Sequence, residues 1–354
     1  MRAVTPADRE PPTAVVLGAA GFVGRNICDM LSTRGWSVLA VARGGAPDLP
    51  PGCHLERLDL LRSPTGDLSA LLARERPALV VNAAGALWDV TDQELTEGNV
   101  TLVRRLVEAM ASLPRPARLV HIGSAYEYGG HPADVPLTED LTERPTSGYA
   151  RTKLAGTRVL TEAVAEGRLD AVVLRIAMSV GPHTSPHSLL GGLAAQLARR
   201  PAELRLPPIR GVRDIVDIRD VAEAVRCAAR AERVPPVVNI GSGVGVPLVD
   251  AVEALLRISG TDATVHRADD ADPSKPAGTR RDAGIGEQPL DISRARSELG
   301  WAPRHSLDDA LSALWETVPR PVGAPTTAFD PSAFDPPAPT TTSTLAADGE
   351  RIHG

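Results

Sequence analysis

Residues 13–33 read TAVVLGAAGFVGRNICDMLST, which is a short apolar strand, a turn with three spaced glycines, and a helical run. A dinucleotide-binding α/β fold needs these parts in this order. Gly18 allows a tight turn, Gly21 lets the backbone approach a pyrophosphate, and Gly24 lets helix and strand pack closely. The spacing is GxxGxxG rather than GxGxxG, but the flanking strand and helix support the same interpretation. The turn predicts cofactor contacts from Gly18, Gly21, Phe22, Val23 and Gly24.

The second predicted strand, residues 37–42, indicates which cofactor is expected. In an NAD site, an acidic residue at the end of this strand binds the ribose 2′-hydroxyl. Ala42 occupies that place here, and Arg43 follows it. A missing carboxylate and a new cation suit a 2′-phosphate, so the sequence predicts NADP(H), with NAD(H) as the second choice. The alternative is that Arg43 is only a solvated charge in a loop.

Other predicted strand ends add cofactor contacts. Residues 59–60 (Asp-Leu) close a short strand near the adenine edge, and residues 78–82 run into a small-residue segment at 83–85. That segment would let the backbone pass close to a cofactor. Asn99 opens a predicted helix over 100–111, either as a helix cap or as a site residue. Outside the glycine turn, the predicted cofactor residues are Arg43, Asp59, Leu60, Ala83, Ala84, Gly85, Asn99, Tyr149 and Lys153.

Strands alternate with helices through the first half of the chain, which is typical of an α/β fold with a doubly wound parallel (Rossmann) sheet. Ligands of such sheets bind at the carboxyl ends of the strands. After a strand at 171–177 the alternation loosens, which predicts a smaller, interleaved C-terminal substrate lobe. The predicted parts are a flexible extension (1–12), a Rossmann domain (13–178 and 212–243), a substrate-binding lobe (179–211 and 244–318) and a disordered tail (319–354).

Residues 124–153 carry the predicted chemistry: they begin at Ser124, after a strand at 118–123, and end in Tyr149-x-x-x-Lys153. If Tyr149 lies in the first turn of a helix, this spacing places Lys153 on the same helix face. A phenol has a pKa of about 10, and a nearby cation lowers that pKa. Ser124 would hold a carbonyl or alkoxide oxygen beside Tyr149. The three residues are therefore the predicted catalytic set for moving a proton on oxygen while a hydride moves on carbon.

Composition excludes several other classes of function. Of the 354 residues, 43% are hydrophobic, and the net charge is −6 without a basic run, which argues against nucleic acid and anionic membranes as partners. No apolar run reaches the length of a membrane span, and the N-terminus carries no apolar signal segment. Three widely spaced cysteines and no metal-ligand spacing predict a reduced, cytoplasmic protein without a bound metal.

Together these residues resemble the extended short-chain dehydrogenase/reductases, the NAD-dependent epimerase/dehydratase group, over roughly residues 13–318. The resemblance is carried by GAAGFVG (18–24), Asp59-Leu60, NAAG (82–85), Ser124 with Tyr128-Gly129, Tyr149/Lys153, LRIAMSVGP (174–182), RDIVDIRDVAEAV (213–225), VVNIGSG (237–243) and DISRARSELGWAP (291–303). It implies Tyr149 as general acid/base. It also implies that Lys153 lowers the pKa of Tyr149 and holds the nicotinamide ribose, and that Ser124 binds the reacting oxygen.

In this group the catalytic set acts on a sugar hydroxyl or ketone, usually in a nucleoside-diphosphate sugar. The acid pair that dehydratases carry is replaced by Ala125 and Tyr126, which disfavours dehydration. IGSAYEYG at 122–129 is similar to the same stretch of GDP-4-dehydro-6-deoxymannose reductases. Glu127 either tunes the site or caps local backbone. Because reductases exchange their cofactor in each cycle whereas epimerases keep NAD bound, the Ala42–Arg43 pair favours reduction.

The substrate residues are assigned by the same resemblance. Arg213, Arg280 and Arg281 lie where the group places diphosphate-binding arginines, and cations suit a pyrophosphate. Met178 stands where many nucleotide-sugar enzymes have an asparagine, so either the nucleotide is held differently or the substrate carries none. The predicted substrate-binding residues are Ala125, Tyr126, Glu127, Met178, Arg213, Arg280 and Arg281.

The sequence thus predicts NADPH-dependent reduction of a keto group, foremost the 4-keto group of a nucleoside-diphosphate 4-keto-6-deoxyhexose, with Tyr149 as proton donor. One alternative is a nucleotide-sugar epimerase with tightly held NAD. Another is a ketoreductase for a natural product without a nucleotide. A non-catalytic NADP-binding sensor is disfavoured by the retained Tyr149/Lys153 pair. By analogy with the group, helices near 100–111 and 152–165 predict a homodimer.

Overall fold

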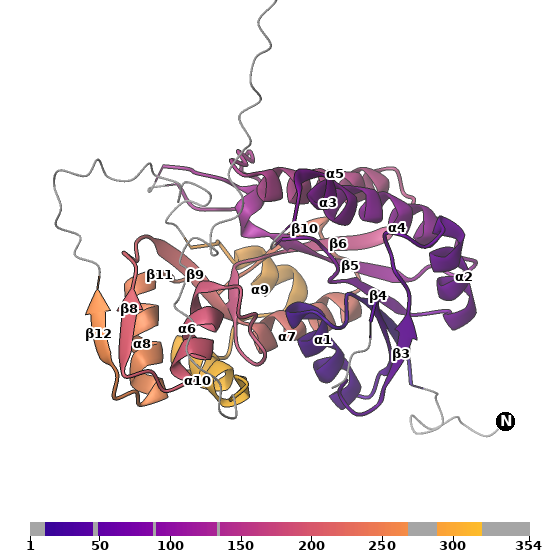
Figure 1. Ribbon diagram of the computed structural model, residues 1–354. Coiled ribbons are helices and arrows are strands. Elements are labelled where there is room, and N and C mark those ends of the chain that lie inside the picture. The colour runs from indigo at the N-terminus through magenta and orange to yellow at the C-terminus, as the bar shows by residue number, and fades with distance from the viewer. Residues whose placement is uncertain (1–10, 45–48, 88–89, 133–134, 268–288, 321–354) are drawn as a thin grey trace, which may run out of the picture.

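The computed structural model describes residues 11–44, 49–87, 90–132, 135–267 and 289–320. At its centre is a seven-stranded parallel sheet with the strand order β10-β6-β5-β4-β1-β2-β3 (Figure 1). Its strands are β1 (Thr13–Leu17), β2 (Ser37–Ala42), β3 (Cys53–Arg57), β4 (Leu79–Asn82), β5 (Arg118–Ser124), β6 (Asp170–Ile176) and β10 (Val237–Ile240). The predicted doubly wound parallel sheet is confirmed.

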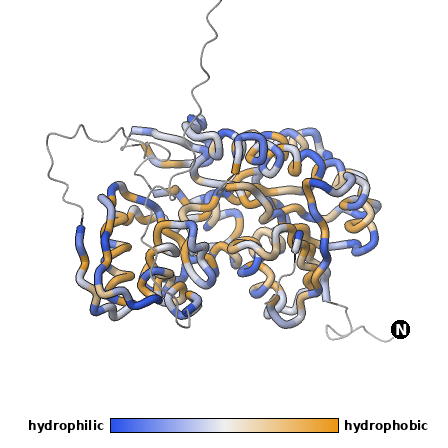
Figure 2. Tube along the Cα trace, in the orientation of Figure 1, coloured by the Kyte–Doolittle hydropathy of each residue, from blue (hydrophilic) through white to orange (hydrophobic). Residues whose placement is uncertain are grey.

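The central strands are mostly apolar because both faces of the sheet are covered. β1 lies between β2 and β4, with Val15 aligned with Leu39 and Val80, and it is buried from Ala14 to Leu17. Figure 2 shows hydrophobic stretches running through the strands and hydrophilic ones on the outer helices and loops. Because the strands are parallel, the carboxyl ends of β1, β2, β4 and β5 meet at one edge of the sheet.

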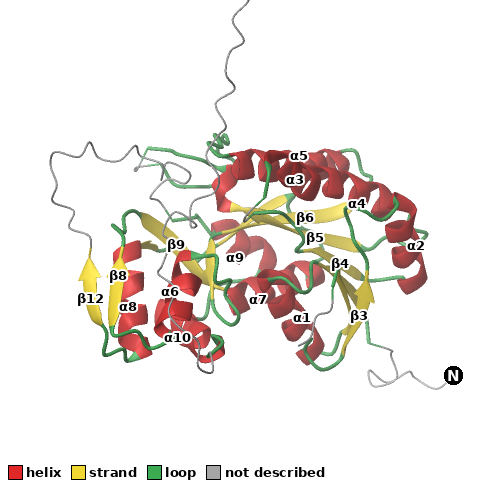
Figure 3. Cartoon of the chain, viewed as in Figure 1, coloured by secondary structure: helices red, strands yellow, loops and turns green. Residues whose placement is uncertain are grey.

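Two layers of helices cover the sheet (Figures 1 and 3). One layer contains α1 (Phe22–Thr33), α7 (Ile218–Arg230) and α9 (Ser293–Leu299), and the other contains α2 (Thr65–Glu75), α3 (Asp92–Thr96), α4 (Leu102–Ala111) and α5 (Gly148–Ala165). Ile27 of α1 and Val225 of α7 belong to the first core. Leu72 of α2, Leu106 of α4 and Leu160 of α5 belong to the second. The sheet is thus packed against apolar helix faces on both sides.

A smaller lobe is built from the later part of the chain. Its strands form two separate sheets with the orders β11-β9-β7 and β12-β8. Its elements are β7 (Met178–Val180), α6 (Leu189–Leu197), β8 (Glu203–Leu206), β9 (Val212–Asp217), β11 (Gly245–Pro247), α8 (Leu248–Ser259), β12 (Thr264–Arg267) and α10 (Leu307–Thr317). Leu193, Leu255 and Leu311 belong to a core of its own. Between β9 and β11 the chain returns to the central sheet through α7 and β10.

The structure changes two of the predicted domain boundaries. The sequence predicts residues 212–243 in the Rossmann domain, but β9 pairs with β7 and β11 of the lobe. The sequence predicts α9 in the lobe, but Ala295 and Leu299 pack in the core of the central sheet. Hydrogen-bonding partners far along the chain decide both placements, and local sequence patterns do not report them.

The helix that carries Tyr149 begins earlier than predicted. The sequence predicts a helix over 152–165, whereas α5 begins at Gly148 because the Ser147 hydroxyl accepts a hydrogen bond from the N–H of Ala150 at 3.1 Å. Tyr149 therefore lies in the first helical turn, which is the condition for the predicted pairing with Lys153.

Parts of the prediction fall on residues that the structure does not describe. The extension at 1–12 and the tail at 319–354 lie almost wholly outside the described residues, and so do Arg280 and Arg281. Within the described ranges, no helix is long and apolar enough to span a membrane, and no group of three or more His, Cys, Asp or Glu side chains is arranged to hold a metal ion.

Candidate active site

The glycine turn is shaped by close backbone contacts. Gly18 has φ +77°, and a Cβ there would lie 2.7 Å from Cα of Ala84. A Cβ on Gly24 would overlap the carbonyl oxygen of Gly18. Gly21 precedes α1 and gives it no side-chain cap. An uncapped helix N-terminus next to a glycine turn binds phosphate groups, so this geometry fits the pyrophosphate of a dinucleotide.

Asn99 holds the small-residue segment beside the glycine turn. Its Oδ1 accepts from the N–H of Ala86 at 3.1 Å, and its Nδ2 donates to the Ala86 carbonyl at 3.0 Å and to Thr152 Oγ1 at 3.1 Å. Asn99 lies inside the π-helical turn η2 (Glu97–Thr101), so it does not cap a helix. It positions residues 83–86 and ties them to α5. A Cβ on Gly85 would lie 2.9 Å from Asn99 Oδ1, which explains the glycine.

Arg43 follows the end of β2, which lies next to β1, and Asp59 follows the end of β3, which lies next to β2. Arg43 is exposed directly after β2, and the N–H of Gly18 donates to Val41 at 3.1 Å, which places the glycine turn beside this strand end. Asp59 follows β3, and its Oδ1 accepts from the N–H groups of Leu61 and Arg62. Both predicted cofactor residues therefore lie at the same edge of the sheet as the glycine turn.

The three predicted catalytic residues come together at the end of β5. Ser124 is the last residue of β5, and its hydroxyl lies near enough to the phenol of Tyr149 to lower the pKa of that phenol. Lys153 is buried, and its Nζ donates to the carbonyl oxygen of Ile122 at 2.7 Å. The ring of Tyr126 meets the ring of Tyr149 edge to face, with 6.0 Å between centroids. The hydroxyl of Ser124 and the phenol of Tyr149 thus lie close together at the carboxyl edge of the sheet.

Burial sets the charge states of this cluster. It raises the pKa of Tyr149, with Glu127 and Tyr126 acting in the same direction and the hydrogen bond with Ser124 opposing them. Burial also lowers the pKa of Lys153 to about 8. The ammonium of Lys153 is directed to the carbonyl oxygen of Ile122, and the predicted lowering of the Tyr149 pKa by Lys153 stays a prediction. At neutral pH Tyr149 is a neutral phenol, which is the form that donates a proton.

Glu127 is placed differently from the prediction that it contacts substrate. Its side chain has no exposed surface, and its two oxygens accept from the N–H of Ser124 and from Nε of Arg175, each at 2.9 Å. Ser124 and Glu127 form reciprocal caps of the short helix η3 (Ala125–Glu127). The structure contains the local capping that is one of the two alternatives for Glu127, and the charge of Glu127 also raises the pKa of Tyr149.

A small pocket next to η3 gathers three predicted substrate residues. It is lined by Ala125, Met178 and Arg213, together with Leu137, Ala177, Asp214 and Leu290. Arg213 is half-buried and donates to the carbonyl of Val212 at 2.8 Å. The pocket joins the end of β5 to the lobe, where the sequence places the substrate.

A profile of the NAD dependent epimerase/dehydratase family matches residues 14–241. The chain belongs to this family. The dTDP-6-deoxy-L-talose 4-dehydrogenase (NAD(P)(+)) of Kitasatospora kifunensis is 38% identical over 310 residues, 86% of this chain and 95% of that protein. The UDP-glucose 4-epimerase of Mycolicibacterium smegmatis is 28% identical over 315 residues, 85% and 97% of the two chains. The solved structure of MoeE5 in complex with UDP-glucuronic acid and NAD has a TM-score of 0.70 and 27% identity, and it covers 86% and 98%.

These relatives extend the family assignment to the class of enzyme. Family membership and a relative of 38% identity make the chain an NAD(P)-dependent oxidoreductase of the extended short-chain dehydrogenase/reductase type. The glycine turn and the cluster of Ser124, Tyr149 and Lys153 both lie at the carboxyl edge of the parallel sheet, where ligands of such sheets bind.

Two residues of the site escaped the sequence prediction. Arg175 is the next-to-last residue of β6 and pairs with Glu127; the signal was an arginine after the apolar run AVVL of a buried strand, because a buried charge requires a partner. Asp214 is buried and accepts hydrogen bonds from the backbones of Gly243 and Leu290 and from both the N–H and the hydroxyl of Ser242. It fixes Leu290, a wall of the small pocket.

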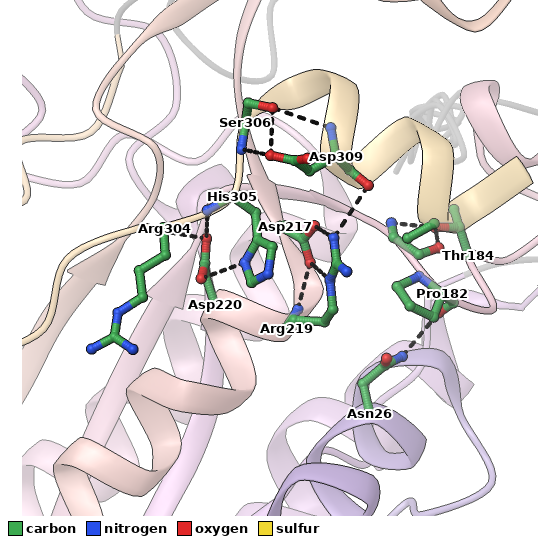
Figure 4. Close-up of polar contacts among 12 residues, drawn as sticks. Asn26, Pro182, Thr184, Asp217, Arg219, Asp220, Arg304, His305, Ser306 and Asp309 are labelled. Carbon is green, nitrogen blue, oxygen red and sulfur yellow. Dashed lines mark hydrogen bonds and ion pairs between the residues drawn. The ribbon is translucent and has the colours of Figure 1, made fainter. Parts of the chain in front are cut away.

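A larger cavity, of about 700 Å³, lies between α1, α7 and the segment around His305 (Figure 4). Asp220 accepts from the N–H groups of Arg304 and His305 at 2.9 Å and contacts His305 Nδ1 at 2.8 Å. Asn26 donates to the carbonyl of Pro182 at 3.0 Å. These contacts tie the segment after α9 and the loop after β7 to the two helices. None of the predicted site residues in the described ranges lines this cavity.

Proposed function

We propose that this enzyme reduces the 4-keto group of a nucleoside-diphosphate 4-keto-6-deoxyhexose, with NADPH as the reductant. The observation that carries the proposal is the meeting of Ser124, at the end of β5, with Tyr149 and Lys153, in the first turns of α5, at the carboxyl edge of the sheet. A raised pKa keeps the proton on Tyr149, as a general acid requires. The Kitasatospora relative is named for the dehydrogenation of a dTDP-linked 6-deoxyhexose at C4, the reverse of such a reduction.

The residues divide the chemistry among them. Tyr149 Oη would donate its proton to the ketone oxygen while Ser124 Oγ donates a hydrogen bond to the same oxygen. Lys153, held at the Ile122 carbonyl, would place a positive charge one turn along α5. NADPH, when bound, supplies the hydride; Gly18, Gly21 and the N-terminus of α1 would hold its pyrophosphate. Arg213 in the small pocket would meet the anionic part of the substrate.

Two cations support NADPH over NADH. Arg43 follows β2 directly, and Arg57 at the end of β3 lies level with Ala42. Both are exposed, and the end of β2 carries no carboxylate of the kind that binds the ribose in an NAD site.

Epimerisation is the second candidate, because the M. smegmatis relative is named a UDP-glucose 4-epimerase. An epimerase oxidises and re-reduces the same carbon with a retained NAD. It would be purified with its cofactor bound, and it would show no net oxidation of NADPH. It would also interconvert two sugar nucleotides without added cofactor.

The test of the proposal is cofactor consumption by the purified enzyme. dTDP- and GDP-4-keto-6-deoxyhexoses, generated in place by a dehydratase, are each supplied with NADPH and with NADH. We expect oxidation of NADPH in preference to NADH with one of the sugars. If neither sugar causes oxidation of NADPH or NADH, although NADPH binding is measured, the proposed substrate class is overturned. The substrate would then be a ketone that carries no nucleotide.

Arg43→Ala is expected to raise the KM for NADPH by about 10-fold or more, because a lost charge-assisted hydrogen bond of ~1.5 kcal/mol corresponds to that factor. The KM for NADH should stay nearly unchanged. Arg34→Ala, at the opposite end of α1, removes the same charge away from the cofactor edge and serves as the control. Equal losses with the two cofactors would show that Arg43 does not read the 2′-phosphate.

A further inference from the structure

Glu127 and Arg175 form a buried ion pair directly behind Ser124. Arg175 Nε donates to Glu127 Oε2 at 2.9 Å, and the side chains are 1% and 0% exposed. The other oxygen of Glu127 accepts from the N–H of Ser124 at 2.9 Å. One carboxylate therefore connects a side chain near the end of β6 to Ser124, the residue that ends the neighbouring strand β5.

The same arginine reaches the loop that leads to Tyr149. Arg175 Nη2 donates to Oε1 of Glu143, a residue shortly before α5, at 2.5 Å. The guanidinium carbon lies 4.7 Å from the ring centroid of Tyr128, whose hydroxyl donates to Asn239 Oδ1 of β10 at 2.7 Å. The network thus links the end of β5, which carries Ser124, with the loop that leads into α5, which carries Tyr149.

Stability alone is a poor explanation for this network. Removing two charges from water carries a penalty, and well-packed apolar side chains of similar volume are often at least as stable. Among the described residues, Nη1 of Arg175 is also buried without a hydrogen-bond partner, which adds to the penalty. An arrangement with these disadvantages, placed behind a reacting hydroxyl, is better explained by the geometry that it imposes.

We propose that Glu127 and Arg175 are positioning residues that fix Ser124 beside Tyr149 for proton transfer. The proposal rests on the ketoreductase function proposed above. With its N–H held by Glu127, the backbone of Ser124 stays extended (φ −145°, ψ 139°), and its Oγ accepts from the N–H of Tyr126 at 3.3 Å. The contact with η3 therefore fixes the orientation of the Ser124 hydroxyl, including its proton and its remaining lone pair, and the hydroxyl does not rotate freely.

The charge of Glu127 gives this role a signature that a merely structural pair lacks. Tyr149 is faced by Ser124 from β5 and by Tyr126 and Glu127 from η3, with Lys153 one turn along its own helix. The carboxylate of Glu127 raises the pKa of Tyr149 and also that of Lys153. A neutral residue at position 127 lowers both, so the alkaline limit of ketone reduction should move to lower pH.

The test compares the double variant Glu127→Val/Arg175→Met with Glu127→Gln. A matched control, Glu223→Val/Arg226→Met, replaces a half-buried ion pair on α7 by the same residues away from the site. With dTDP- or GDP-4-keto-6-deoxyhexose and NADPH, we expect the folded double variant to lose about 10- to 100-fold in kcat, with little change in KM. Glu127→Gln, which keeps an acceptor for the Ser124 N–H, should recover part of kcat but show the same shift of the alkaline limit.

A substrate-independent measurement separates failure of this proposal from failure of the proposed function. Titration of the phenols by ultraviolet absorbance, with Tyr149→Phe subtracted, reports the ionisation of Tyr149 alone. We expect that ionisation to shift to lower pH in Glu127→Gln. Parental kcat and an unshifted titration in the folded variants would overturn the positioning role. A parent that reduces neither sugar, with a shifted titration in Glu127→Gln, would overturn the substrate class and leave the positioning role supported.

Discussion

Replacing Tyr149 with phenylalanine is expected to lower kcat for ketone reduction by about 10²- to 10⁴-fold, the range for a positioned general acid. The substitution removes only the phenol hydroxyl, which lies near Ser124. It keeps the ring that packs against Tyr126. Fold and cofactor binding should therefore be preserved. The measurements are steady-state kcat with the 4-keto sugar and the NADPH dissociation constant from quenching of protein fluorescence.

Ser124→Ala provides the comparison for this variant. Ser124 polarises the oxygen that Tyr149 protonates, so we expect a smaller loss in kcat. We also expect the double variant to lose little more than Tyr149→Phe alone, because residues that act as a unit are not additive. Additive losses would mean that the two hydroxyls act independently. Turnover at the parental rate in Tyr149→Phe, with cofactor bound, would assign the proton to another donor and remove the basis of the proposed mechanism.

The parts of the fold that the sequence predicts correctly are those set by short-range signals. β1 and β2 have the predicted boundaries because each is an apolar run closed by a glycine or a charged residue. The start of α5 was misplaced because its Ser147 cap follows a proline-rich loop that reads as irregular structure. β9 was misplaced because its partners are distant in sequence.

The site residues divide in the same way, between those that short-range signals place and those that long-range contacts place. Ser124, Tyr149 and Lys153 could be predicted because a strand end and a helix first turn place them without reference to other residues. The contact between Glu127 and Arg175 spans 48 positions, and no spacing rule reports it. The hydrogen bond of Lys153 to Ile122 was equally hidden because a backbone acceptor has no residue signature. The raised pKa of Tyr149 follows chiefly from burial, with the charge of Glu127 acting in the same direction, and neither cause is local in the sequence.

Lys153→Met is expected to lower kcat/KM for NADPH by about 10²-fold or more, because a buried cation next to the reacting groups acts in a low dielectric. Burial lowers the pKa of Lys153 to about 8. The ammonium is thus charged below that pH and becomes neutral as the pH rises through it. In the parent, kcat/KM for NADPH at saturating ketone should therefore fall above about pH 8. In Lys153→Met the remaining activity should not show this fall.

Among the titratable groups of the site, Lys153 is the one to which this alkaline fall of kcat/KM is assigned. His121 lies against Asn82 at 3.0 Å, and burial and the charge of Lys153 hold its pKa well below the usual value, so it is neutral throughout this range. The pKa of Tyr149 is raised, so its proton is retained to higher pH. Lys153→Arg stays charged, so it should move the alkaline limit to higher pH, although the larger guanidinium lowers the rate. An alkaline limit at the parental pH in both variants would show that another group titrates, and would separate the charge of Lys153 from the chemistry of the site.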